Sequence, residues 1–206
     1  QDNLEKYQLA EQALELMITG KPLQVWEQEI YASGQLIKGH LGQSQLKAAI
    51  NKAKTVYNNL SLNGEATTYS GYIDCDGAEL GGQVENGYQD TIWNYRTGQM
   101  RKRQLLKAWI EQLFVNALGH NLSTRLVATK TQSGIVKIEN SIFKPVSRGE
   151  ATTLLSEFMN LHQKALNRPL PFLPELSGQW VESINKDETD TVRNKKIVSA
   201  WNQDMT

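Results

Sequence analysis

The sequence predicts an α/β (α+β) domain that follows a helical lead-in. Apolar residues recur at helical spacing through residues 1–60. Residues 61–97 then divide into short strand-like runs separated by Gly- and Asn-containing turns. A long helix, two more strands and further helices complete the order, without an internal repeat. We therefore expect residues 1–60 to form the lead-in and residues 61–206 to form the domain.

The lead-in is predicted to be helical from Leu4 to Ile18, with Gly20 as a natural stop. Pro22 can open a short second helix, which continues through Trp26 to Ile30. A glycine-rich connection follows at residues 33–43. Ser44 has a side chain suited to an N-cap, so a third helix is expected from there to Leu60.

Strands are predicted from Thr67 to Thr97, after a turn at Asn63-Gly64. The strands are expected to break at three places where turn-forming residues gather: Cys75-Asp76-Gly77, Gly81-Gly82 and Asn86-Gly87.

A long helix is predicted next, because apolar residues recur in pairs every four positions and form a wide stripe. The stripe consists of Leu105, Leu106, Trp109, Ile110, Leu113, Phe114, Ala117 and Leu118. Trp109 lies in the middle of the stripe and is expected to be almost fully buried. Gly119 is expected to end the helix.

The remaining sequence predicts two strands and more helices. The strands, near Thr124–Lys130 and Ile135–Phe143, are expected to turn at residues 131–134. A helix from Glu150 to Leu166 is expected to pack these residues inward: Leu154, Leu155, Phe158, Leu161 and Ala165. Pro169, Pro171 and Pro174 predict a stiff extended segment, which precedes a short helical piece at Trp180 and a basic, helix-like run from Val192 to Trp201.

Composition limits the possible functions. Lys plus Arg and Asp plus Glu both number 22, so the net charge of zero disfavours a generic polyanion binder but leaves room for a local basic patch. Cys75 is the one cysteine, which excludes an internal disulfide and a cysteine-rich zinc site. No apolar stretch is long enough for a membrane span and no signal peptide opens the chain, so we expect a cytoplasmic protein. Because the chain begins with Gln1, we expect it to be part of a longer protein.

Common catalytic motifs are absent from the sequence, which predicts no cofactor and no metal. There is no G-x-G fingerprint, phosphate loop, H-E-x-x-H or G-x-S-x-G elbow, and the three histidines are scattered. Cys75 lies between Asp74 and Asp76, whose charges disfavour a nucleophilic thiolate.

One run of residues has the layout of the PD-(D/E)xK nuclease core: strand, turn, strand and helix over Gly81–Leu118. In that core two carboxylates hold Mg²⁺ and a lysine positions or activates the attacking water. Glu85 takes the place of the first carboxylate, but Asn94 offers one neutral oxygen and Arg96 cannot deprotonate. No lysine or arginine has Asp or Glu two positions before it, so a working D/E-x-K is absent. We predict no catalytic residue, whether these are degenerate positions or ordinary strand residues.

A second candidate site is a basic run that leads into the long helix, where unpaired backbone N–H groups attract phosphate. Its residues are Arg96, Arg101, Lys102, Arg103 and Lys107. We predict DNA contact by Arg96, Arg101, Lys102 and Arg103, with an ordinary solvated surface as the alternative.

Several segments, in order and spacing, resemble the C-terminal region of the RecC family over essentially the whole chain. Residues 7–9 and the first helix look like its opening segment, and residues 34–42 are similar to its G-x-L-P-x-G-x-x-G signature, with Ile37 where Pro is usual. Residues 105–113 resemble its L-L-x-x-W-x-E-H-L helix, with Gln112 in place of His. Residues 169–180 look like its proline-rich stretch ending in Trp, and residues 195–201 look like its K-A-R-K-A-W.

The resemblance implies a non-catalytic subunit (gamma) of bacterial exodeoxyribonuclease V, which works with RecB and RecD in double-strand-break repair and recombination. It implies a PD-(D/E)xK-like domain without activity that splits or channels forked or single-stranded DNA and contacts RecD. The family's sequence continues beyond the A-W element, so we expect this chain to stop before the native C-terminus.

Two other function classes remain open from the sequence: a purely protein-binding assembly module without DNA contact, and an active nuclease domain. Salt-dependent binding to forked DNA would separate the first of these from a DNA-contacting domain.

A docking segment is also predicted within Pro169–Trp180, where prolines fix the backbone and Phe172 and Leu173 offer apolar anchors. The alternative is that these side chains cap the domain's own core.

Overall fold

The computed structural model describes residues 3–37, 39–132, 135–168, 174–186, 189–192, 194, 195 and 198. Its elements follow in the order α1 (Asn3–Ile18), α2 (Leu23–Ala32), α3 (His40–Tyr57), β1 (Thr67–Cys75), β2 (Ala78–Tyr88), β3 (Thr91–Tyr95), α4 (Lys102–Ala117), β4 (Ser123–Gln132), β5 (Ile135–Phe143), α5 (Arg148–Asn167) and α6 (Pro174–Asn185). This confirms a mixed α/β fold with a helical lead-in. Residues 190–192, 194, 195 and 198 are also helical, while the rest of the predicted Val192–Trp201 run lies outside the described residues.

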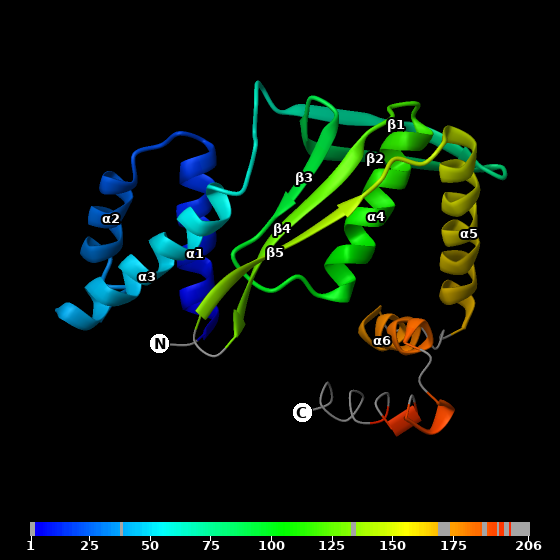
Figure 1. The fold of residues 1–206 in the computed structure, drawn as a ribbon. Helices are drawn as coiled ribbons and strands as arrows, with labels where there is room; N and C mark the ends of the chain where they lie inside the picture. The colour runs from blue at the N-terminus through cyan, green and yellow to red at the C-terminus, as the bar shows by residue number, and fades with distance from the viewer. Residues whose placement is uncertain are drawn as a thin grey trace. The chain divides into compact units, whose positions relative to one another are not determined.

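The strands form one sheet in the order β1-β2-β3-β4-β5 (Figure 1). Strand β3 runs antiparallel to β2 and parallel to β4, with a register from Thr91↔Ser123 to Tyr95↔Val127. Strand β5 returns antiparallel to β4, from Thr124↔Phe143 to Gln132↔Ile135. The parallel pair requires a crossover, which α4 supplies between β3 and β4 in the sequence.

The chain divides into two compact units. Unit 1 contains residues 1–69, 84–100 and 122–145, and unit 2 contains residues 70–83, 101–121 and 146–206. The predicted boundary between residues 60 and 61 stays a prediction.

Unit 1 has its core between the lead-in helices and the sheet. Helices α1 and α3 pack side by side, and both contribute to a cluster that also contains Trp93 of β3 and Val127 of β4 (Figure 1). The helices form because their small and aliphatic residues recur at helical spacing, as with Leu9, Ala13, Leu46 and Ala53, which are all buried. The lead-in therefore shares its core with the sheet.

Unit 2 has its core around the second half of α4, which packs against α5 and α6. Leu113 and Val115 are completely buried there. Gly82 of β2 lets the Phe114 ring approach closely, since a Cβ added at this glycine would lie 3.1 Å from the ring. Gly71 of β1 does the same for Leu118, at 2.8 Å. These glycines are strand residues that admit an aromatic or aliphatic side chain.

Two of the three predicted turns are wrong, because their glycines lie inside a strand and admit neighbouring side chains. Gly81-Gly82 does not break the strand but lies inside β2. Asn86-Gly87 also lies inside β2, where Gly87 admits the Tyr69 ring, and the chain reverses after Tyr88 instead. The turn at Cys75-Asp76-Gly77 is confirmed: Asp76 and Gly77 both have positive φ, and the Gly77 N–H donates to Asp74 Oδ1 at 2.8 Å.

The start of the third helix was also predicted wrongly. Helix α3 begins at His40, after Gly39 at a φ of 88°, so Ser44 lies inside the helix and not at its N-cap. Gly42 in its first turn is buried, and a Cβ there would lie 2.0 Å from the Ile37 carbonyl oxygen. The glycines of the connection thus permit a tight entry into an earlier helix.

Two burial predictions are corrected by the structure. Trp109 is half-buried and not almost fully buried, because the buried residues of α4 are concentrated in its second half, from Gln112 to Ala117, and Trp109 lies one turn before Leu113 on the same face. In α5 the prediction holds for Leu155, which is buried, whereas Leu161 and Ala165 are exposed. The later turns of that helix extend beyond the residues that pack against α4.

Candidate functional site

The end of β3 carries two of the residues that were compared with a nuclease site. Trp93 and Tyr95 pack with the cluster built by α1 and α3. Asn94 lies between them, so strand alternation directs its side chain to the opposite face of the sheet. The Arg96 N–H then donates to the Val127 carbonyl oxygen at 3.0 Å, which holds the chain beside β4 just after β3 ends.

The side chain of Arg96 is engaged with the lead-in. Its Nη2 donates to the Tyr7 hydroxyl at 3.0 Å, and its guanidinium lies 5.4 Å from the centre of the Tyr7 ring. Burial raises the pKa of the Tyr7 hydroxyl, and the charge of Glu11 adds to this, so the phenol stays neutral. The Nε of Arg96 is buried without a hydrogen-bond partner among the described residues.

Glu11 lies one turn after Tyr7 in α1 and binds Thr97, the residue that follows Arg96. Its Oε1 accepts from the Thr97 N–H at 2.5 Å and from the Thr97 hydroxyl at 2.6 Å. The Thr97 carbonyl oxygen in turn accepts from the Thr129 hydroxyl of β4. We call the four residues Tyr7, Glu11, Arg96 and Thr97 the α1 clamp. It fastens the exit of β3 to the lead-in helix.

Glu85 lies on β2, with an exposed side chain, and it precedes the part of the strand paired with β3. That pairing covers Gly87↔Ile92 and Tyr88↔Thr91, and Asn86 between Glu85 and the pairing has a φ of 61°. The side-chain contacts of Arg96 described above join it to Tyr7 of α1. Within the described residues there is no group of three or more His, Cys, Asp or Glu side chains able to hold a metal ion.

Two lysines of the basic run at the start of α4 form ion pairs. Lys102 forms a salt bridge with Glu182 of α6, and Lys107 forms one with Glu111 at 3.5 Å. The hydrogen bond from Lys102 lowers the pKa of the Glu182 carboxyl. Arg101 and Arg103 have exposed side chains. The predicted docking residues Phe172 and Leu173 lie outside the described part of the chain.

Cys75 is buried, and burial raises the pKa of its thiol, with smaller contributions in the same direction from Asp74 and Asp76. A raised pKa leaves little thiolate at neutral pH. This agrees with the prediction that Cys75 is not a nucleophile.

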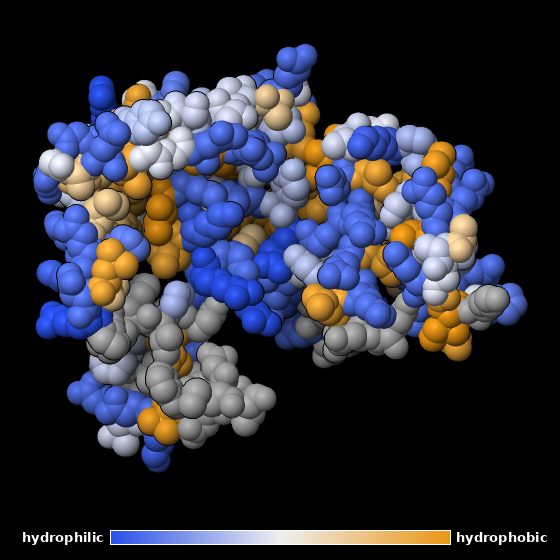
Figure 2. Space-filling model, turned by 180° about the vertical axis from the view of Figure 1, so that it is seen from behind, coloured by the Kyte–Doolittle hydropathy of each residue, from blue (hydrophilic) through white to orange (hydrophobic). Residues whose placement is uncertain are grey.

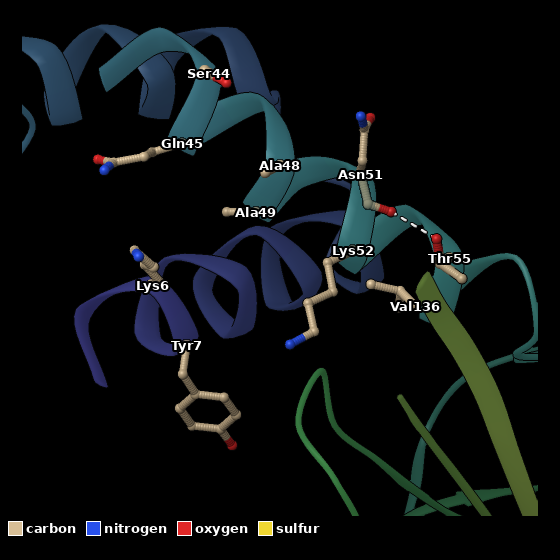
Figure 3. Close-up of a pocket in the computed structure, with 10 residues that line it drawn as sticks. All are labelled: Lys6, Tyr7, Ser44, Gln45, Ala48, Ala49, Asn51, Lys52, Thr55 and Val136. Carbon is tan, nitrogen blue, oxygen red and sulfur yellow. Dashed lines mark hydrogen bonds between the residues drawn. The ribbon is translucent and has the colours of Figure 1, made fainter. Parts of the chain in front are cut away.

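A groove that the sequence analysis did not anticipate runs between α1 and α3 and has a volume of about 780 Å³ (Figure 3). It is lined by Lys6, Tyr7, Ser44, Gln45, Ala48, Ala49, Asn51, Lys52, Thr55 and Val136. Figure 3 shows Lys6 on α1, and Lys52 extending from α3 across α1. We call this the α1–α3 groove. The sequence does contain a signal for it, since no acidic residue occurs between Glu29 and Glu65.

Lys52 is the groove's half-buried cation. Burial lowers the pKa of its ammonium group, and the charge of Glu11 partly opposes this. Among the described residues Lys52 has no carboxylate within salt-bridge distance, because Glu11 is directed to Thr97. Gln45 of the same groove has a buried Oε1 without a hydrogen-bond donor among the described residues.

The molecular face drawn in Figure 2 shows several separate hydrophobic patches among hydrophilic residues. In the described part of the chain, no helix has both the length and the hydropathy required to cross a bilayer.

These features define a mixed α/β domain with a helical lead-in, in which β3 carries Asn94 and is followed directly by Arg96. The chain belongs to the family of the RecC C-terminal domain, which matches residues 1–185. Over 192 residues the chain is 20% identical to the "RecBCD enzyme subunit RecC" of Escherichia coli (strain K12). The similarity covers 93% of this chain and 16% of the E. coli protein, so the chain spans about a sixth of that relative's length.

Proposed function

We propose that this chain is a DNA-contacting domain, without cleavage activity, of a RecC-type subunit. The subunit would work with RecB- and RecD-type partners in a RecBCD helicase-nuclease, in the repair and recombination of broken DNA in the bacterial cytoplasm. Membership of the RecC C-terminal domain family supports this proposal. The domain's share of the work would be to guide separated DNA strands and to hold a partner subunit.

The proposal includes a PD-(D/E)xK-like core with a degenerate site. The order β2, β3, α4, β4 follows the strand, strand and helix layout of that core, with Glu85 on β2 and Asn94 on β3. Asn94 gives Mg²⁺ one neutral oxygen where a carboxylate is needed. The observation that carries the proposed absence of cleavage is the α1 clamp, in which Arg96, the residue compared with the catalytic lysine, binds Tyr7.

Cleavage assays test this proposal directly. The purified chain is incubated with Mg²⁺ or Mn²⁺ and with linear duplex or single-stranded DNA, and we expect no degradation. The matched control is Glu85→Ala, which removes the one carboxylate left in the compared positions. Metal-dependent cleavage by the parent chain that disappears in Glu85→Ala would contradict the proposal, whereas cleavage equal in both proteins would identify a contaminating nuclease.

Subunit assembly is a second candidate function, and the exposed apolar side chains of α6 favour it. Trp180, Val181 and Ile184 are 39%, 54% and 46% exposed, and their spacing groups them on one side of the helix. Exposed apolar residues grouped in this way are typical of protein contact surfaces. We propose that this surface meets the RecD-type subunit.

Co-purification with the RecD-type subunit tests the assembly surface. We expect Val181→Asp and Ile184→Asp to weaken co-purification while the melting temperature of the chain stays nearly unchanged. Val25→Asp on α2 is the control, since Val25 is equally exposed at 52% but lies in unit 1. An equal loss for Val25→Asp, or no loss for the α6 variants, would assign the contact to another surface.

A further inference from the structure

The charge of this chain is distributed unevenly even though its total is zero. Between Glu29 and Glu65 there are four lysines, Lys38, Lys47, Lys52 and Lys54, and no acidic residue. Helix α3 lies entirely inside this stretch. Since local fields act over about 10 Å at moderate salt, α3 presents a positive surface although the molecule as a whole is neutral.

The α1–α3 groove concentrates this charge. Lys52 of α3 and Lys6 of α1 both line it, so the groove has one cation from each helix. The nearby carboxylate of Glu11 is held by the N–H and hydroxyl groups of Thr97 and makes no salt bridge with Lys52. A half-buried ammonium group without an ion-pair partner favours an anion at this place.

The remaining lining limits the kind of anion. Ala48 and Ala49 give the groove a floor of small side chains, which leaves room for an elongated ligand. Ser44 and Gln45 add neutral polar residues of α3 to the same lining. A nucleic-acid strand suits this lining because its phosphates carry negative charge and accept hydrogen bonds.

We propose that the α1–α3 groove binds the backbone of a single nucleic-acid strand, with Lys6 and Lys52 contacting its phosphates. This inference rests on the proposed DNA contact and gives it a location. It moves that contact away from the basic run at Arg101–Arg103, where Lys102 is already paired with Glu182.

The test compares two double variants that lose the same charge. Lys6→Gln/Lys52→Gln removes the groove cations, and Lys47→Gln/Lys54→Gln removes two exposed lysines of α3 that do not line the groove. Binding of a fluorescent oligo(dT) is measured over a salt series. We expect the groove variant to flatten the slope of log K against log salt by about 1.4, from about 0.7 per phosphate contact on a single strand. The control variant is expected to keep the parent slope, and thermal melts verify that both variants are folded.

If the groove variant is unstable, a second measurement tests the same groove assignment on the parent chain. Lysine acetylation of the parent chain, read by mass spectrometry, is expected to show protection of Lys6 and Lys52 by oligo(dT) and no protection of Lys47. Equal protection of all three lysines, or of none, would overturn the groove assignment.

The other outcomes separate the groove from the broader proposal. If Arg101→Gln/Arg103→Gln abolishes binding while the groove variant binds like the parent, the chain contacts DNA but the groove assignment is wrong. If the parent chain does not bind oligo(dT) even at low salt, the proposed DNA contact itself fails. If polyglutamate of equal charge displaces oligo(dT) equally well, the groove takes an acidic peptide and the nucleic-acid assignment is overturned.

Discussion

Arg96 and Lys102 lie close together in the sequence and were both predicted to contact DNA, yet the structure gives them different surroundings. Arg96 is half-buried in the α1 clamp, where Tyr7 binds its guanidinium. Lys102 lies at the surface of unit 2 in a salt bridge with Glu182, whose side chain is about half exposed. The first contact is partly removed from water, whereas solvent screens the second.

The difference shows that a run of basic residues is a poor guide to a free positive surface. What matters is whether a carboxylate or an aromatic ring lies within reach of each cation. The basic run of α4 has such partners for Lys102 and Lys107. The lysines of α3, which are spread more thinly, lie in a stretch that contains no acidic residue at all.

The largest effect is expected for Glu11→Ala. This change removes the acceptor of the Thr97 N–H and hydroxyl groups, and Thr97 is completely buried, so two donors lose their partner. We expect a loss of about 3 kcal/mol in the free energy of unfolding, measured by urea denaturation. Glu15→Ala, which removes an exposed carboxylate from the same helix, is expected to cost less than about 0.5 kcal/mol. Equal losses would mean that the clamp does not stabilise unit 1.

A smaller effect is expected for the contact between Tyr7 and Arg96, the other pair of the α1 clamp. In a double-mutant cycle of Tyr7→Phe and Arg96→Ala, we expect a coupling energy of about 1 kcal/mol, because the hydrogen bond is lost while most of the ring remains. The cation–π contact survives in Tyr7→Phe, so Arg96→Ala alone is expected to cost more than Tyr7→Phe alone. Additive losses would show that Arg96 and Tyr7 do not stabilise each other.

The smallest effect is expected for Lys102→Ala, which should cost less than about 1 kcal/mol because its ion pair is exposed. The lowered pKa of Glu182 gives this contribution a pH dependence. It is present above the ordinary glutamate pKa and is lost as the pH falls through the lower pKa of the folded state. The difference in melting temperature between parent and variant is therefore expected to shrink on acidification below about pH 4.5. A constant difference across this range would exclude the ion pair as its cause.

Much of the fold could be predicted because periodicity reports local structure. The apolar repeat of α1 and the stop at Gly119 depend on neighbouring residues alone. Gly81 and Gly82 were predicted wrongly because their role is set by the side chains of Tyr72 on the neighbouring strand and Phe114 on α4, which a local turn signal does not include. The burial of Trp109 was overestimated because a stripe of apolar residues does not tell how far along the helix the core extends.

The candidate site was predictable to a lesser extent. The sequence alone shows that no D/E-x-K exists, since this depends on spacing within a few residues. The α1 clamp could not be found this way, because it joins residues of the first helix to the end of β3. The α1–α3 groove could not be predicted from a dense basic run, because its lysines are spread thinly and its signal is the lack of acidic residues between Glu29 and Glu65.

The α1 clamp also affects how the chain folds as it is made. Glu11 and Thr97 are 86 residues apart, so α1 leaves the ribosome well before its partner exists. At synthesis rates of about 5–20 residues per second, the end of β3 is synthesised roughly 4–17 s after α1. During this interval the apolar side of α1 can be covered by α3 but not yet by Trp93. Unit 1 therefore cannot close until its central strand has been translated.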